Sequence, residues 1–282
     1  MDRTNMTDEI LRAEGYLMQD QDEQAAELLA RLAEDAEEYV DRNCPTTDSV
    51  QWFAFPSIFE RLAYRRVEDD PRELHDVGEP LNRLYGDLAL AYVKTGAYEM
   101  AIEALKQAIR WNPMDCGARL DLADLFRITG DMQEYLALAY TVFERAHDAR
   151  HLARAFLIFA TYFEACEKPR TAAAALHAAR KLDVRDSALA AALDQAAGTE
   201  RDPSVVTDEE AAELLAAEGL PDGANAEIAV CLLMCASDAA SAGECDLATT
   251  LTLRARDLVG EPASLALLEL IRSSEADSGA GE

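Results

Sequence analysis

The chain has 282 residues, half of them apolar, and it carries 26 Lys and Arg against 54 Asp and Glu, for a formal net charge of −28. This charge repels nucleic-acid phosphates and anionic lipid head groups, so the composition predicts no nucleic-acid binding and no membrane binding. The length suffices for two ordinary domains or for one elongated repeat domain with a large core.

Three further features bear on the compartment. The sequence has no uninterrupted run of about 18 apolar residues, which is the length that crossing a bilayer requires. The start MDRTNMTDEI also lacks the basic segment followed by an apolar run that is typical of a secretory leader. The six cysteines, apart from the last three, lie far apart, and a chain of this size needs no disulfide framework. We therefore expect a cytoplasmic protein.

The charge is distributed unevenly along the chain. Residues 1–50 carry 14 acidic and 4 basic side chains, residues 82–186 carry 14 of each, and residues 187–282 carry 19 acidic and 4 basic side chains. Acidic runs usually mark solvated faces that keep a protein dispersed. The alternative is that one of the acidic flanks is a surface for a partner.

The first 81 residues predict a helical region that caps the molecule. Thr7 is a candidate cap for a helix to about Asp20, and DEQAAELLARLAEDAEEYV continues as a second helix to Val40, so the two are compatible with a hairpin. NCPTTDS then breaks the pattern. QWFAFPSIFERLAYRR holds five aromatic residues and predicts an apolar loop followed by a helix from about Ser57. This segment would cover the open end of the helical region that begins at residue 82.

The segment YVKTGAYEMAIEALKQAIRWNP, residues 92–113, predicts the end of one helix, a turn at Gly96 and a second helix that stops at Pro113. Ala101, Leu105 and Ala108 lie on one face of that second helix. The pattern recurs 34 residues on and again after another 37. Leu88, Ala89, Tyr92 and Gly96 become Leu122, Ala123, Phe126 and Gly130, and then Phe159, Ala160, Phe163 and Glu167.

This period and the order Leu-Ala-x-x-Tyr, Gly, Ala, Leu, Ala, Pro resemble tetratricopeptide repeats, and the chain is also similar to bacterial proteins built from them. The resemblance implies an all-α fold, an α–α superhelix of antiparallel helical hairpins with helical N- and C-terminal caps. The copies would span 82–115, 116–149 and 153–186, and a degenerate fourth copy would begin at 229.

The remaining segments follow from local signals. Residues 187–228 predict a linker and a short helix, which Thr207 caps with Glu210 and Gly219 ends. Residues 229–273 hold the degenerate copy, to about residue 262, and a capping helix that ends near Arg272. Residues 274–282 predict a disordered tail.

Two groups of side chains could do chemistry. His147 and His151, four residues apart with Asp148 between them, loosely resemble the pair that binds zinc in hydrolases, but the repeat places them across a turn and no third ligand is evident. Cys231 and Cys235, with Cys245 nearby, could in principle hold a soft metal, although Cys235 falls on a packing position. We therefore expect no catalytic residues, no metal, no cofactor and no enzyme activity.

The repeat resemblance implies a groove lined by the first helix of each hairpin. The positions that would line it are Arg83, Leu90, Lys94, Leu120, Asp124, Arg127, Arg154, Leu157 and Glu164. The three leucines would anchor a peptide and the basic residues would steer its acidic groups. Some members of the family clamp a C-terminal carboxylate with Lys and Asn, but only Arg154 agrees with that pattern here.

The sequence thus predicts a non-catalytic scaffold or adaptor that binds a peptide or a partner helix in the repeat groove. One alternative is a regulatory receptor for a short signalling peptide in the same groove. A second is a zinc-dependent hydrolase that uses His147 and His151. Self-association through the ends of the solenoid or through the acidic flanks is compatible with all three.

Overall fold

The computed structural model describes the backbone of residues 3–279 and the side chains of residues 6–271. Within this part the chain is helical almost throughout, which confirms the predicted all-α superhelical class. The chain divides into two compact units, Met1–Tyr135 and Leu136–Glu282, and the boundary falls inside α7 (Met132–Arg145), the second helix of the second predicted repeat. Each unit is described by itself.

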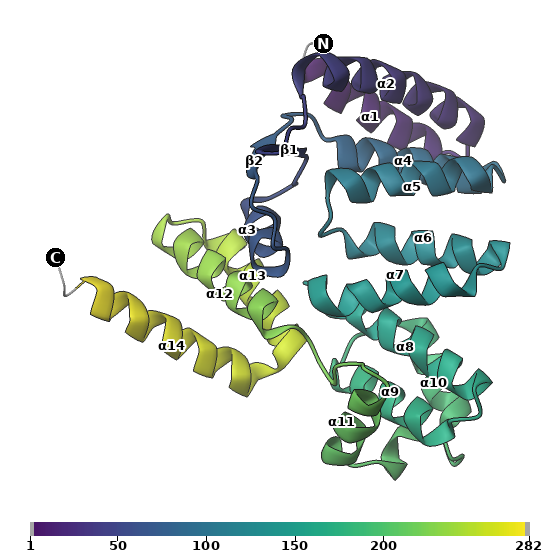
Figure 1. Ribbon diagram of the computed structural model, residues 1–282, viewed down its shortest axis with the longest axis vertical. Helices are drawn as coiled ribbons and strands as arrows, with labels where there is room; N and C mark the ends of the chain where they lie inside the picture. Colours follow the sequence, from purple (N-terminus) through teal and green to yellow (C-terminus); the bar gives the residue numbers. More distant parts are fainter. Residues whose placement is uncertain (1–2, 280–282) are drawn as a thin grey trace. The chain divides into compact units, whose positions relative to one another are not determined.

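Unit 1 is a stack of helices that lie side by side (Figure 1). The stacked helices are α1 (Arg3–Leu17), α2 (Asp22–Asn43), α4 (Leu81–Lys94), α5 (Tyr98–Trp111) and α6 (Cys116–Thr129). In α5 the buried residues include Ala101, Leu105 and Ala108, the predicted apolar face. Small alanines let α5 approach α4 closely, and Asn112 and Pro113 follow its last turn.

The turn between the two helices of a hairpin is the same wherever the repeat occurs. At Gly96 the backbone is left-handed (φ 77°), Gly96 N donates to Val93 O, and Ala97 N donates to Tyr92 O at 2.8 Å. This pair of bonds is a Schellman motif, which satisfies the last carbonyls of a helix. The same bonds and a positive φ recur at Gly130, Glu167 and Gly243.

The N-terminal hairpin ends its first helix with this turn as well. Asp20 is left-handed (φ 54°) and Gln21 N donates to Tyr16 O at 2.9 Å, so Tyr16 takes the place of Tyr92. The helices α1 and α2 therefore form one more stacked hairpin, which packs on α4 and covers the open end that the sequence assigned to the aromatic segment. The helix α1 already begins at Arg3, because nothing before Thr7 interrupts it, so the predicted cap at Thr7 is wrong.

The aromatic segment contains strand as well as helix, which corrects the predicted loop. Strand β1 (Val50–Phe53) precedes α3 (Ile58–Val67) in the sequence and strand β2 (Glu73–Asp76) follows it. The two strands pair with each other in parallel. The helix α3 starts near Ser57, as predicted, and Ser57 is its N-cap, whose side chain accepts from Glu60 N. Ala54 N donates to Trp111 O at 2.9 Å, so the segment packs at the end of α5.

Unit 2 begins with the last part of α7, which is followed by the third repeat, α8 (Ala149–Ala165) and α9 (Pro169–Lys181). Phe143 of α7 packs against Phe156 of α8 at 4.8 Å between ring centroids. The helix α10 (Ser187–Ala196) was not predicted; Asp186 caps it by accepting from Leu189 N. A 3₁₀ turn (Pro203–Val205) leads to α11 (Asp208–Ala217), which Thr207 caps as predicted. Both α10 and α11 pack on α9, so residues 187–217 are an ordered part of the unit.

The C-terminal part of unit 2 is the degenerate copy and a long final helix. The copy consists of α12 (Ala226–Ser241) and α13 (Cys245–Val259), and α14 (Glu261–Gly279) packs on both. The predicted disordered tail is helical as far as Gly279, because no glycine or proline stands between Pro262 and Gly279; residues 280–282 lie outside the described residues. Across residues 3–279, no helix combines the length and the hydropathy that crossing a bilayer requires.

Candidate functional site

The helix α4 presents two different faces in unit 1. Arg83, Leu90 and Lys94 are seven and four residues apart, which places them on one side of an α-helix. Tyr85, Leu88 and Tyr92 are three and four residues apart and lie on the opposite side. The first face is the predicted groove. The second borders a cavity that the sequence analysis did not predict.

The two predicted cations on α4 are already engaged by the N-terminal hairpin. Arg83 donates from Nε and Nη2 to the two carboxylate oxygens of Glu14 at 2.7 and 2.8 Å. Lys94 Nζ lies 3.2 Å from Asp20, 3.0 Å from Asp22 and 3.1 Å from the carbonyl oxygen of Leu17. Their predicted role as free charges that steer an acidic partner is therefore corrected. They hold α1 and the start of α2 beside α4.

Apolar side chains lie exposed beside these ion pairs. On α1, Leu11 is 51% exposed and Met18 is 87% exposed; on α4, Leu90 is 47% exposed and Val93 is 36% exposed. We call these four residues the apolar strip. Large apolar side chains that gather on one face usually mark a site for another molecule.

The other predicted groove residues have different environments. Leu120 on α6 is fully buried, so the prediction that it anchors a peptide is wrong; the packing of unit 1 places it inside. Asp124 and Arg127 form an ion pair at 3.5 Å one turn apart on α6. Arg154, Leu157 and Glu164 lie on α8 in unit 2, where Arg154 and Leu157 are half-buried and Glu164 pairs with Arg201.

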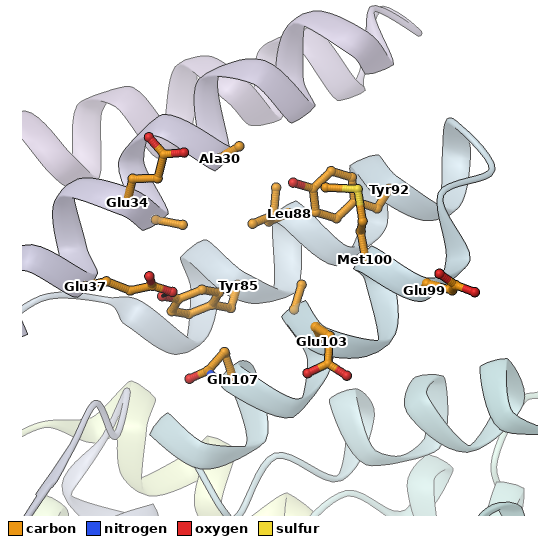
Figure 2. A pocket seen from close by; sticks show the side chains of 12 residues that line it. Ala30, Glu34, Glu37, Tyr85, Leu88, Tyr92, Glu99, Met100, Glu103 and Gln107 are labelled. Carbon is orange, nitrogen blue, oxygen red and sulfur yellow. Dashed lines mark hydrogen bonds between the residues drawn. The ribbon is translucent and has the colours of Figure 1, made fainter.

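The opposite face of α4 borders a cavity of about 450 Å³, which we call the acidic cavity (Figure 2). Three helices line it: α2 with Ala30, Ala33, Glu34 and Glu37, α4 with Tyr85, Leu88 and Tyr92, and α5 with Glu99, Met100, Glu103, Ala104 and Gln107. The glutamates stand at its rim in Figure 2, around the tyrosine rings and the methionine. Burial, and then the charge of Glu34, raises the pKa of Tyr92.

A signal for the acidic cavity exists in the sequence, although it is weak. Glu34 and Glu37 are three residues apart, and Glu99 and Glu103 are four apart, so each pair lies on one face of its helix. Such pairs are common on solvated faces. Only the stacking of α2 beside α5 brings the two pairs to one opening.

One carboxyl group near the apolar strip should make the stability of unit 1 depend on pH. Burial, and then the nearby Glu14 carboxylate, raises the pKa of Asp87 from 3.8 to about 7. The folded protein therefore holds this proton more tightly than the unfolded chain, so its stabilising contribution is full below 3.8 and is lost as the pH rises through about 7. We expect Asp87→Asn to flatten the pH dependence of stability in this range.

Urea unfolding of the wild type and of Asp87→Asn at about pH 5 and about pH 8 measures this effect. The free energy of unfolding of the variant, relative to that of the wild type, should be higher at the higher pH than at the lower pH. Asp35→Asn, an exposed position on α2, is the control and should leave the dependence unchanged. Equal differences at the two pH values for Asp87→Asn would contradict the assignment.

The side chains considered for zinc lie across a turn. His147 precedes α8 and His151 lies in its first turn, while Asp148 caps the helix by accepting from Arg150 N at 2.8 Å. Burial, and then the charge of Arg254, lowers the pKa of His147 to about 4. Cys231 and Cys235 are buried in α12. Within the described residues, no three His, Cys, Asp or Glu side chains form a group that could hold a metal ion.

Comparison with known proteins agrees with the geometry of α4 and α5. Residues 83–114 match the family model of the tetratricopeptide repeat. No curated protein matches the chain, and the bacterial origin stays a prediction. The matched residues cover the hairpin whose turn recurs at Asp20, Gly130, Glu167 and Gly243. The hairpin of α4 and α5 is therefore a tetratricopeptide repeat, matched to the family at residues 83–114.

Proposed function

We propose that this protein is a non-catalytic interaction scaffold that binds a segment of a partner protein on the apolar strip of unit 1. Tetratricopeptide repeats serve protein interaction in general, and the finer assignment rests on one observation. Leu11 and Met18 on α1, and Leu90 and Val93 on α4, are each exposed, and these two helices are the first helices of two neighbouring hairpins.

The surroundings of the strip favour an apolar partner segment. Arg83 and Lys94 are held by acidic residues of the N-terminal hairpin, so the charges beside the strip are largely compensated. A segment that buries apolar side chains there would gain about 25 cal/mol for each Å² removed from water. An amphipathic helix or an extended peptide with spaced apolar residues fits this surface.

The predicted groove residues outside the strip extend this proposal. Asp124 and Arg127 on α6 of unit 1 are candidates for further contacts with this partner. Arg154, Leu157 and Glu164 on α8 are a separate candidate surface, which belongs to unit 2. The six cysteines form no disulfide in the structure, which supports the proposed cytoplasmic location.

A photo-crosslinking amino acid at position 90 tests the proposal in the source organism. We expect it to capture a discrete partner, with crosslinked peptides that map to the α1 and α4 side of unit 1. Val93→Asp should weaken this capture by about tenfold, because a charge in an apolar contact must lose its water. Leu247→Asp is the matched control, since Leu247 is 43% exposed on α13 in unit 2.

The result that would overturn the proposal is equal capture in wild type and Val93→Asp. The same crosslinker at position 247 reports background contacts. A short peptide that is captured in place of a protein would favour the alternative role as a receptor for a signalling peptide.

A further inference from the structure

The acidic cavity is a second surface of unit 1, and Figure 2 shows the side chains that line it. Its α4 residues lie on the side of that helix opposite Arg83, Leu90 and Lys94. Its volume of about 450 Å³ lies within the range of ordinary ligand sites. Leu88, Met100 and the ring of Tyr92 give it apolar surface, and Met100 is 52% exposed. The cavity is thus open to a chain that lies across α2 and α5.

The charges around the acidic cavity all have one sign. Its lining includes four glutamates and no lysine, arginine or histidine. Glu103 pairs with Lys106 at 2.7 Å, and Glu37 accepts a long hydrogen bond of 3.4 Å from the hydroxyl of Tyr85. Among the ion pairs of the described residues, none involves Glu34 or Glu99. Two carboxylates on opposite rims are therefore available to a cation.

A long basic side chain matches both features of this cavity. Lysine and arginine carry an apolar stem with a charged end, so the stem can cover Leu88 and Met100 while the charge stays at the rim. A guanidinium or ammonium group also binds the face of a tyrosine ring, as Tyr92 could provide. An acidic or purely apolar segment would leave the glutamates without compensation.

We propose that the acidic cavity binds a lysine- or arginine-bearing segment of a partner protein, with the basic side chain between Glu34 and Glu99 and its stem against Tyr92 and Met100. This site is separate from the apolar strip. The strip takes apolar side chains, and the cavity takes basic ones. The protein then offers two surfaces of different chemistry on opposite sides of the same repeat.

Fluorescence anisotropy with a labelled peptide of alternating Lys and Leu, at near-physiological salt, tests this inference on the full chain. A chain of net charge −28 attracts any cation, so the comparison needs variants that remove the same charge. Glu34→Gln with Glu99→Gln should weaken binding by about tenfold or more. Asp35→Asn with Asp194→Asn, at exposed positions outside the cavity, should weaken it less than about twofold.

A second variant tests the space itself. Met100→Lys places an ammonium group in the cavity, at a position that is 52% exposed. This group competes with the peptide for the glutamates, so the variant should not bind the peptide. A peptide with Gln in place of Lys should not bind in any background. Circular dichroism should show the same helicity for all variants.

Two outcomes would overturn the inference. Equal weakening in the two double variants would mean that the peptide responds to the total charge and not to the cavity. Displacement of the peptide by spermidine at equal concentration would mean that the site takes small organic cations and not a protein segment. Neither outcome changes crosslinking at position 90, so the failure of this inference is distinguishable from that of the proposed function.

Discussion

Leu120→Ala should lower the free energy of unfolding by about 2 to 5 kcal/mol, although the repeat pattern assigns Leu120 to a binding groove. The structure buries Leu120 completely on α6, so its truncation leaves a cavity as well as removing apolar contact. Urea unfolding followed by circular dichroism measures the change.

Leu90→Ala is the matched control for this result. It removes the same atoms from a leucine that is 47% exposed on α4, so we expect a change within about 0.5 kcal/mol. The two leucines have the same predicted role and opposite environments. Equal effects of the two substitutions on stability would contradict the burial of Leu120.

Ala101→Trp should destabilise the central hairpin by about 1 to 3 kcal/mol or more. Ala101 has no exposed surface and lies where α5 packs on α4. An indole ring there must push the two helices apart or leave its rotamer wells. The melting temperature and the urea midpoint should both fall. A dye that fluoresces on apolar surfaces should bind more strongly to the variant than to the wild type.

Met100→Trp is the control for this result, because it introduces the same indole side chain one residue earlier on α5. Met100 is 52% exposed, so the ring can stay in solvent and we expect little change in stability. A melting temperature of Ala101→Trp equal to that of the wild type would mean that α5 does not present Ala101 to its neighbour.

Local signals predicted several turns and helix starts correctly, although the cap predicted at Thr7 is wrong. Gly96, Gly130 and Gly243 mark turns because a left-handed residue ends a helix most readily when it has no side chain. Ser57 and Thr207 mark helix starts because their hydroxyl groups accept from a backbone N–H three residues on. Such signals depend on a few neighbouring residues, so they are readable before the fold is known.

Two local signals, one for a turn and one for a helix start, were missed in the sequence. The turn at Asp20 has the geometry of Gly96 but not its residue type, so the N-terminal hairpin stayed an open question. The helix α10 was missed because its cap, Asp186, is the last residue of the predicted third repeat, while the helix itself falls in the segment predicted as a linker.

The sequence by itself determined that this protein is a series of helical hairpins, because a helix face and its turn are specified by residues within about one repeat of each other. Only the tertiary structure decided what the faces do. Arg83 meets Glu14, Leu120 is buried, and the glutamates of α2 and α5 share one cavity. These outcomes depend on how hairpins stack, and stacking joins residues whose distance along the chain carries no periodic signal.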